Sequence, residues 1–255
     1  MTSQCFSDIL LPDIPGIVTL VGAGGKTSLM FKLAQEIIAL GQTVLTTTST
    51  KIFKPNLEQS LSIFCTDQPL QWLDDKKDIL NSSKHITLAK REVANNKLQG
   101  LDPETIDVLW KTGRFDWILV EADGAAGRPI KAPADHEPVI PRLSQSVIAV
   151  LGLKGFNLPL VEEWIFRPHI FSTLTGRNRG EIILFKDLVK VLTHKKGILK
   201  GTPSKSEKSI YLNQADNQKL FSLGKEFVRA LKDSCPLFFS RYALGSLHSG
   251  MIHKT

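Results

Sequence analysis

The sequence has few cysteines and no long apolar run, and each shortage argues against a class of protein. Its three cysteines, Cys5, Cys65 and Cys235, form no C-x-x-C pair and have no histidine nearby at metal-ligand spacing. They fit reduced thiols in a reducing compartment. No window approaches the roughly eighteen unbroken apolar residues of a membrane span, and residues 1–16 lack the basic start and long apolar core of an export signal. We therefore expect a cytoplasmic protein without a membrane segment.

Charge is unevenly distributed along the chain. Residues 1–140 carry a net charge of −3, whereas residues 141–255 carry +10. Such an excess could attract nucleic acid, a phosphorylated ligand or an acidic partner. The basic residues are not interleaved with aromatic residues as in a base-stacking platform, which favours a solvated face. A non-catalytic nucleic-acid-binding protein is therefore the least favoured of three functions that we consider.

Strand and helix patterns alternate through the sequence. With 255 residues, 42% of them hydrophobic, the chain fits a single α/β domain over residues 1–255. Apolar runs predict strands, and apolar residues at helical spacing predict helices, the first of which ends at Gly41. Asp102 can cap another helix, with Pro103 at its first position and Gly113 past its end. The predicted strands are 17–21, 43–48, 117–120, 147–151, 209–212 and 237–240, and later helices are 184–192 and 218–231. This order is typical of a P-loop NTPase-like fold, a mainly parallel sheet with helices on both faces.

The stretch "GAGGKTS" lies between the first predicted strand and the first helix. Glycines let backbone amides converge on an anion, the helix N-terminus adds its positive dipole end, a lysine neutralises phosphate charge, and a threonine hydroxyl can bind Mg²⁺. The loop is shorter than the pattern G-x-x-x-x-G-K-[ST]: Leu20 stands where the first glycine would be, and Gly22 lies only three residues before Gly25. A dinucleotide-binding G-x-G-x-x-G is less favoured, because it would need a glycine at position 27, where Thr27 stands. We predict a shortened phosphate loop at residues 22–27, with nucleotide-binding residues Gly22, Ala23, Gly24, Gly25, Lys26, Thr27 and Ser28.

Two acidic residues follow the predicted strand 117–120. Glu121 and Asp123 would lie at the end of a strand neighbouring the phosphate loop, where a carboxylate can hold Mg²⁺ or its water. We predict Thr27 and Glu121 as metal-binding residues, and Lys26, Glu121 and Asp123 as catalytic residues. The next residue, Gly124, could let a backbone amide reach the γ-phosphate.

The stretch "YLNQADN" follows a late predicted strand. Asn213 and Asp216 have the spacing of the N-K-x-D pattern with which GTPases recognise guanine, but Gln214 replaces the lysine. We predict a base-recognition region over residues 210–242, to which Ser240, Arg241 and Tyr242 could contribute. The nucleotide is a purine triphosphate, and ATP and GTP both remain open.

Two further stretches are not required by a general NTPase. "TTTSTKIF" places hydroxyl groups and a lysine at the ligand-binding end of the second strand. Residues 124–141 contain four prolines that stiffen the loop and five charged or titratable residues. His136, between two carboxylates, could act as a base or bind a metal. The predicted substrate or partner residues are Thr48, Thr50, Lys51, Arg128, Lys131, Asp135, His136 and Glu137.

Four blocks give the sequence a family resemblance. "LVGAGGKTSLMFKLA", "TTTSTKIF", "LVEADGAAGRPIKAPADHEPVIP" and "LNQAD", in that order, resemble the selenium-dependent hydroxylase accessory proteins, the YqeC-like group of P-loop proteins. The resemblance implies a role in the maturation of molybdenum hydroxylases with a labile selenium cofactor. It makes residues 124–141 the family-specific loop and implies a molybdenum hydroxylase or its cofactor-maturation proteins as partners. The three cysteines lie outside the motifs, so a selenium relay on this chain is not expected.

The leading hypothesis is a Mg²⁺-dependent NTPase that binds ATP or GTP and couples hydrolysis to such a maturation step. The same motifs could serve a small-molecule kinase or nucleotidyltransferase, in which residues 46–51 and 128–137 form an acceptor pocket. A kinase would need its acceptor for turnover, whereas a switch protein would hydrolyse slowly alone.

Overall fold

The structure is a computed structural model that describes residues 4–255, except for the side chains of residues 80 and 81. Nine strands form one large sheet in this part of the chain. Their order is β14-β13-β12-β10-β1-β8-β2-β5-β4, and only β14 is antiparallel to its neighbour. The strands are β1 (Ile17–Gly22), β2 (Val44–Thr48), β4 (Ile63–Cys65), β5 (His85–Ala89), β8 (Trp117–Glu121), β10 (Ser144–Gly152), β12 (Glu207–Asn213), β13 (Arg241–Ser246) and β14 (Met251–Lys254).

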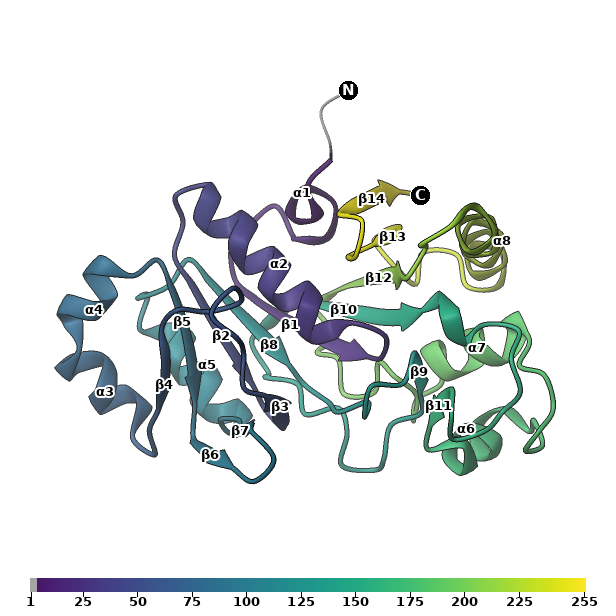
Figure 1. Cartoon of the computed structure of the whole chain (residues 1–255), viewed down its shortest axis with the longest axis horizontal. Helices are drawn as coiled ribbons and strands as arrows, with labels where there is room; N and C mark the ends of the chain where they lie inside the picture. The colour runs from purple at the N-terminus through teal and green to yellow at the C-terminus, as the bar shows by residue number, and fades with distance from the viewer. Residues whose placement is uncertain (1–3) are drawn as a thin grey trace.

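Helices connect most of these strands and cover both faces of the sheet (Figure 1). They are α1 (Phe6–Leu10), α2 (Lys26–Ala39), α3 (Pro69–Asp75), α4 (Lys77–Ser82), α5 (Pro103–Lys111), the 3₁₀ turn η1 (Leu153–Gly155), α6 (Pro168–Thr175), α7 (Phe185–Thr193) and α8 (Gln218–Ser234).

The central strands are apolar along their whole length because they are buried on both faces. Every residue of β1 and β8 is buried, as is usual where helices cover a parallel sheet on both sides. On one face, α1 and α2 pack over residues such as Leu20 and Leu119. On the other face, α3 and α5 pack over Val120, and α6, α7 and α8 pack over Leu151 and Leu212. The core thus fixes the strand ends, which is where the motifs lie.

Two small sheets flank the carboxyl-end edge of the large one (Figure 1). On one side, β3 (Lys51–Phe53), β7 (Lys97–Gln99) and β6 (Arg91–Val93) form an antiparallel sheet. On the other side, β9 (Ile130–Lys131) pairs with β11 (Ile165–Phe166). Backbone bonds from Gly100 to the Thr50 oxygen and from Leu101 to the Thr48 oxygen, both 2.8 Å, join the first small sheet to the end of β2.

Most of the predicted elements are confirmed, including the parallel α/β fold with helices on both faces. The strand predicted at 237–240 is wrong: this stretch is a turn, Leu237 is 99% exposed, and β13 begins at Arg241. Asp102 occupies the N-cap position of α5, but its side chain makes no capping hydrogen bond. Residues 1–3 of the predicted domain lie outside the described residues. Within 4–255, no helix has the length and apolar character needed to cross a membrane.

Candidate nucleotide site

The glycine-rich loop between β1 and α2 is a tight turn fixed against β10. Gly22 and Gly24 have φ angles of 95° and 86°, which residues with a side chain rarely adopt. A side chain at position 24 would also come within 2.4 Å of the Gly152 backbone nitrogen. The Ala23 amide donates to the Val150 carbonyl oxygen at 2.8 Å. The turn therefore opens directly into the N-terminus of α2, the place in a helix best suited to an anion.

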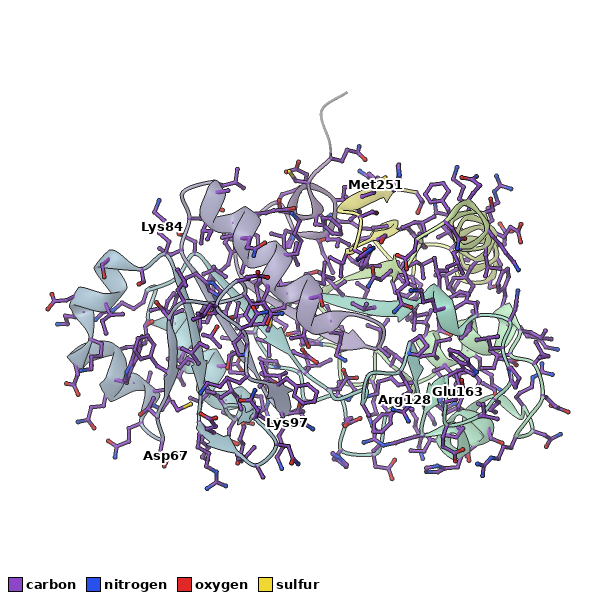
Figure 2. The ribbon with its side chains drawn as sticks, viewed as in Figure 1. Asp67, Lys84, Lys97, Arg128, Glu163 and Met251 are labelled. Atoms are coloured by element: carbon purple, nitrogen blue, oxygen red, sulfur yellow. The ribbon has the colours of Figure 1, made fainter. Side chains whose placement is uncertain are left out.

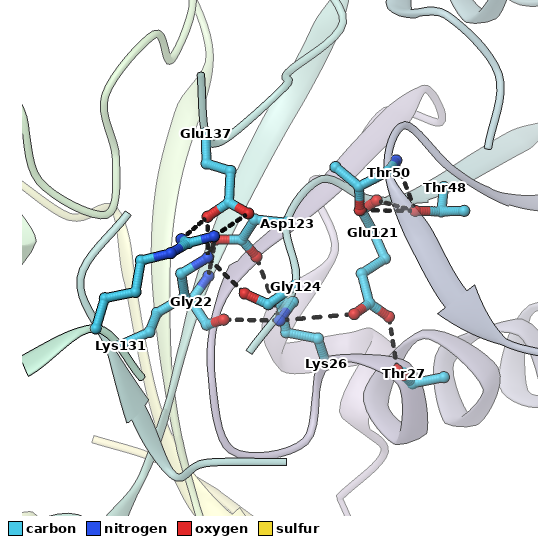
Figure 3. A network of polar contacts seen from close by, with 11 residues as sticks. Gly22, Lys26, Thr27, Thr48, Thr50, Glu121, Asp123, Gly124, Lys131 and Glu137 are labelled. Atoms are coloured by element: carbon cyan, nitrogen blue, oxygen red, sulfur yellow. Dashed lines mark hydrogen bonds and ion pairs between the residues drawn. The ribbon is translucent and has the colours of Figure 1, made fainter. Parts of the chain in front are cut away.

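The Lys26 ammonium lies between two carboxylates at the end of the neighbouring strand β8 (Figure 3). Its Nζ is 3.2 Å from Asp123 Oδ1 and 3.6 Å from Glu121 Oε1, and it donates to the Gly22 carbonyl oxygen at 2.7 Å. The Gly22 amide donates to Asp123 Oδ2 at 3.1 Å. Burial by itself would lower the pKa of Lys26, but Asp123 and Glu121 together raise it. Burial also raises the pKa of Glu121. The lysine is thus charged and held where the loop meets the carboxylates.

Thr27 and Glu121 form an oxygen pair that suits Mg²⁺. The Thr27 hydroxyl donates to Glu121 Oε2 at 2.6 Å. Within the described chain, no three His, Cys, Asp or Glu side chains come together as a metal cage. Mg²⁺ does not need one, since it keeps several waters and takes one or two protein oxygens together with phosphate oxygens. The residues present therefore fit Mg²⁺ bound jointly with a phosphate ligand.

A series of buried ion pairs continues from Asp123 toward the surface (Figure 3). Lys131 is fully buried; its Nζ lies 2.9 Å from Asp123 Oδ2 and 2.7 Å from Glu137 Oε2, and it donates to the Gly124 carbonyl oxygen at 2.6 Å. Glu137 pairs in turn with the Arg167 guanidinium, whose Nη2 donates to Oε1 at 3.1 Å. Burial raises the pKa of Glu137, but hydrogen bonds from Arg167 and the nearby Lys131 outweigh it and bring the pKa to about 2. Together with the Lys26–Glu121 pair, these contacts balance three cations with three carboxylates: Lys26, Lys131 and Arg167 with Glu121, Asp123 and Glu137.

Asn213 anchors the phosphate loop from the side of β12. Its Nδ2 donates to the Gly24 carbonyl oxygen at 2.7 Å, and its Oδ1 accepts from the Leu247 amide at 3.1 Å and the Tyr211 hydroxyl at 3.0 Å. The side-chain oxygen and one of the two N–H donors of the amide are therefore engaged with the protein. Its role in the site is to connect the phosphate loop to the segment after β13.

Asp216 lies further along the same edge and is more accessible. It accepts from the Ser246 hydroxyl at 2.6 Å and pairs with Lys154 Nζ at 2.7 Å. Both contacts lower the pKa of Asp216, which is therefore ionised at neutral pH. Gln214, in the position of the N-K-x-D lysine, has a left-handed backbone with φ of 69°, and its Oε1 accepts from the Lys154 amide at 3.4 Å.

A single open cleft of about 1440 Å³ joins these parts. The predicted site residues that line it are Gly24, Gly25, Lys26, Thr27, Ser28, Thr50, Lys51, Glu121, Arg128, His136, Glu137, Asn213 and Asp216. The phosphate loop lies in the middle, Asn213 and Asp216 lie toward β12, and Lys51 lies on β3. The sequence motifs thus meet at one place, although Gly24 and Asn213, which are in contact, are 189 residues apart in the chain.

The other predicted site residues lie behind or beside the cleft. Asp123 and Lys131 are fully buried beneath it. Thr48 is buried and donates to the Glu121 carbonyl oxygen at 2.7 Å, so it supports β8. Asp135 is exposed and does not line the cleft; its backbone oxygen accepts from Lys200 Nζ at 2.8 Å.

Two expectations about neighbouring residues are wrong. Thr46 and Thr47 do not contribute to an acceptor pocket, because their hydroxyls bond toward β5, to Thr87 Oγ1 and the Leu88 carbonyl oxygen, both at 2.7 Å. The group Ser240 to Tyr242 does not reach a base pocket. Ser240 precedes β13, and Arg241 is its first residue. Arg241 pairs in register with Ser209 near the start of the parallel strand β12, so this group lies at the edge of the sheet away from the cleft.

Sequence reasoning missed several residues that line the cleft, namely Lys97, Lys154, Arg167, Leu247 and His248. Lys154 and Leu247 each follow a strand of the parallel sheet, and this position alone could have indicated them. Arg167 and Lys97 come from elements outside the large sheet, and no local pattern marks them.

The fold and these contacts define an α/β protein of the P-loop class, with the lysine and threonine of the loop facing acidic residues at the end of the adjacent strand. The chain belongs to the YqeC protein family, whose family model matches residues 18–169. It is 36% identical over 200 residues to YqeC of Escherichia coli (strain K12), an alignment that covers 78% of this chain and 76% of that protein.

Two solved structures show a distant likeness. One is the signal recognition particle 54 kDa protein of Aeropyrum pernix K1 in complex with GDP, with a TM-score of 0.40, 15% identity and coverage of 97% of this chain and 45% of that one. The other is the signal recognition particle receptor FtsY of Elizabethkingia anophelis, with a TM-score of 0.32, 12% identity and coverage of 95% and 54%. The chain spans about half the length of each. Likenesses this weak do not identify a function.

Proposed function

We propose that this protein binds a purine nucleoside triphosphate with Mg²⁺ in the cytoplasm and hydrolyses it. The observation that carries the proposal is the placement of Lys26 and Thr27, in the first turn of α2, against Glu121 and Asp123 of the adjacent strand. In this arrangement a lysine, a helix N-terminus and a metal-binding oxygen pair all face one point. That combination suits a polyphosphate, which needs charge neutralisation and backbone donors together.

The residues of the loop have separate roles in this proposal. The amides of Gly22 and Ala23 are already bonded within the protein, so the backbone amides of residues 24–27 and the Lys26 ammonium bind the phosphates. Thr27 with Glu121 holds Mg²⁺, which when bound neutralises charge on the terminal phosphates. Asp123 Oδ1 is buried and accepts no hydrogen bond from any described residue, although the Lys26 ammonium is 3.2 Å away. Because this oxygen lies beneath the cleft, Asp123 serves to fix the Lys26 ammonium, and the water that attacks the γ-phosphorus is placed by the turn at Gly124, which lines the cleft. The bond from that phosphorus to the bridging oxygen would then break.

Base recognition falls to Asp216 in this proposal. Asn213 has its amide committed to the loop and to Leu247, whereas Asp216 is ionised and lines the cleft. A carboxylate accepts hydrogen bonds from ring and amino N–H groups of a purine. Because Gln214 replaces the lysine of the GTPase pattern, ATP and GTP both remain candidates.

The biological step that we propose for this activity is maturation of a selenium-dependent molybdenum hydroxylase. Two things support it: the family resemblance of the four sequence blocks, and the proline-stiffened loop 124–141, which contributes Arg128 and His136 to the cleft. We expect hydroxylase activity to fall in cells in which Lys26→Ala replaces the wild-type chain. Unchanged hydroxylase activity, with the variant present at normal abundance, would contradict this part of the proposal.

A small-molecule kinase or nucleotidyltransferase is the second candidate, and the extent of the cleft favours it. The space continues past Glu121 to β3 and β7, so an acceptor could lie beside the terminal phosphate. The two candidates differ when no acceptor is present: the hydrolase still turns over, because water is its acceptor, whereas the transferase does not.

Phosphate release from Mg-ATP and Mg-GTP tests the proposal. The wild-type chain should release phosphate slowly alone, Thr27→Ala should lose most of the activity, and Lys84→Ala, at the opposite edge of the sheet, should retain it. Appearance of a phosphorylated or nucleotidylated acceptor with little release would transfer the assignment to the second candidate. Neither release nor transfer with either nucleotide would overturn both.

A further inference from the structure

The cleft is larger than one nucleotide site requires. Its volume of about 1440 Å³ exceeds the roughly 300–1,000 Å³ typical of a pocket for one small ligand. The base end toward Asp216 and the phosphate loop occupy one half. The other half lies between the β3–β7 pair and the loop after β8, and no step of the proposed hydrolysis uses it.

This second half carries cations that no carboxylate balances. Lys51 on β3, Lys97 on β7 and Arg128 all line it, and none has a salt-bridge partner among the side chains that the structure describes. The carboxylates that line the same half are already paired, Asp102 with Lys90 at 3.6 Å and Glu137 with the buried network. Three positive charges therefore remain for a ligand.

Arg128 has donors to spare. Its Nε donates to the Glu162 carbonyl oxygen at 2.9 Å and its Nη1 to the Ala126 carbonyl oxygen at 2.8 Å. Within residues 4–255, its Nη2 has no hydrogen-bond partner. The two carbonyl contacts fix the guanidinium plane, and a fixed guanidinium suits an oxyanion. In Figure 2, Lys97 and Arg128 both lie in the lower half of the view, Lys97 left of centre and Arg128 right of centre, whereas Lys84 lies at the upper left.

An aromatic surface lies among these cations. Phe53 lines the cleft with 64% of its surface exposed, and Lys97 Nζ lies 4.8 Å from the centre of its ring. An exposed phenylalanine in a cleft favours a flat or apolar group. The cations favour an anionic group at one end of a ligand, and the Phe53 ring favours a flat or apolar group at the other.

We infer that this half of the cleft binds a second, small ligand that carries a phosphate or carboxylate on a planar or apolar body. The anionic group lies among Lys51, Lys97 and Arg128, and the body lies on Phe53. The inference rests on the proposed function only for placing this ligand beside the terminal phosphate of the nucleotide. The subsite itself depends on residues outside the phosphate loop.

Calorimetric titration with phenyl phosphate tests the inference, because this probe combines a dianion with a flat ring. Benzoate and inorganic phosphate are the comparison probes, and phenol is the uncharged control. The variants are Lys51→Glu, Arg128→Ala and Phe53→Ala, with Lys84→Glu as a matched charge reversal outside the cleft. The same titration in Lys26→Ala shows whether the probe occupies the phosphate loop instead.

We expect phenyl phosphate to bind the wild-type chain at millimolar or lower concentration, and phenol not to bind. Arg128→Ala should weaken binding by about tenfold to a hundredfold, since the guanidinium gives the anion a charge-assisted hydrogen bond. Lys51→Glu should also weaken it, Lys84→Glu should not, and added salt should weaken it in all proteins. Phe53→Ala should affect phenyl phosphate and benzoate but not inorganic phosphate. The relative affinities of phenyl phosphate and benzoate identify the natural anion as phosphate or carboxylate.

The inference is overturned if phenyl phosphate fails to bind, if Lys51→Glu and Arg128→Ala bind it as the wild type does, or if Lys26→Ala alone abolishes binding. If Lys26→Ala does not fold, the comparison of the other charge variants with Lys84→Glu decides. Probe binding without any triphosphate binding would refute the proposed function and leave this subsite intact.

Discussion

Replacing Lys131 by methionine should destabilise the protein strongly, because the residue is fully buried and pairs with two carboxylates. The ammonium is fully buried and has two carboxylate partners, Asp123 at 2.9 Å and Glu137 at 2.7 Å. Methionine has a similar length but no charge, so both carboxylates lose a cation. Removing one member of a buried ion pair costs about 3–5 kcal/mol. Because Asp123 still has Lys26 and Glu137 still has Arg167, we expect about 3 kcal/mol.

Urea unfolding followed by tryptophan fluorescence measures this loss, since Trp117 is buried in β8. The matched control is Lys154→Met: Lys154 lies 2.7 Å from Asp216, but its side chain is 54% exposed. An exposed pair contributes about 0–1 kcal/mol, so this variant should unfold nearly as the wild type does. Adding Glu137→Gln to Lys131→Met removes one of the carboxylates left without its lysine and should recover part of the loss. Equal, small losses in Lys131→Met and Lys154→Met would refute the reasoning that burial determines the strength of these pairs.

Three further predictions concern pH, metal and base. The pKa of Glu137 in the folded protein is about 2, below its ordinary 4.5. Its contribution to stability is therefore complete above pH 4.5 and is lost as the pH falls toward 2. Allowing for solvent in the cleft, we expect the wild type to be more stable to unfolding than Glu137→Gln by about 2 kcal/mol at pH 7, and this difference should disappear near pH 2. Glu121→Ala should remove most of the Mg²⁺ dependence of triphosphate binding, and a binding curve with unchanged response to Mg²⁺ would contradict the metal assignment. Asp216→Ala should chiefly change the ratio of ATP to GTP affinity, and an unaltered ratio would show that the base is recognised elsewhere.

The strands and the motif positions were predictable from sequence because both depend on local patterns. Apolar runs at 17–21 and 117–120 are buried on both faces, and each motif follows such a run directly. Parallel strands bring their carboxyl ends to one edge, so Lys26 and Glu121 were expected at the same edge; the pairing of β1 with β8 brings them into contact.

The remaining contacts depend on tertiary structure that no local pattern encodes. Arg167 meets Glu137 across 30 residues of sequence, through the two-stranded β9–β11 sheet. Lys97 reaches the cleft on a three-residue strand, too short to give a clear alternation. The stretch 237–240 misled because its apolar residues resemble a strand, whereas Phe238 and Phe239 pack against the core from a turn.

Calorimetric titration of ATP, GTP and CTP with Mg²⁺ into the wild type and Lys26→Ala tests the central claim most directly. The account predicts that ATP or GTP binds the wild-type chain more tightly than CTP, and that Lys26→Ala weakens this binding severely, because the lysine is the charged side chain fixed at the phosphate loop. Absence of binding by all three triphosphates at millimolar concentration, or equal affinity in the two proteins, would contradict it.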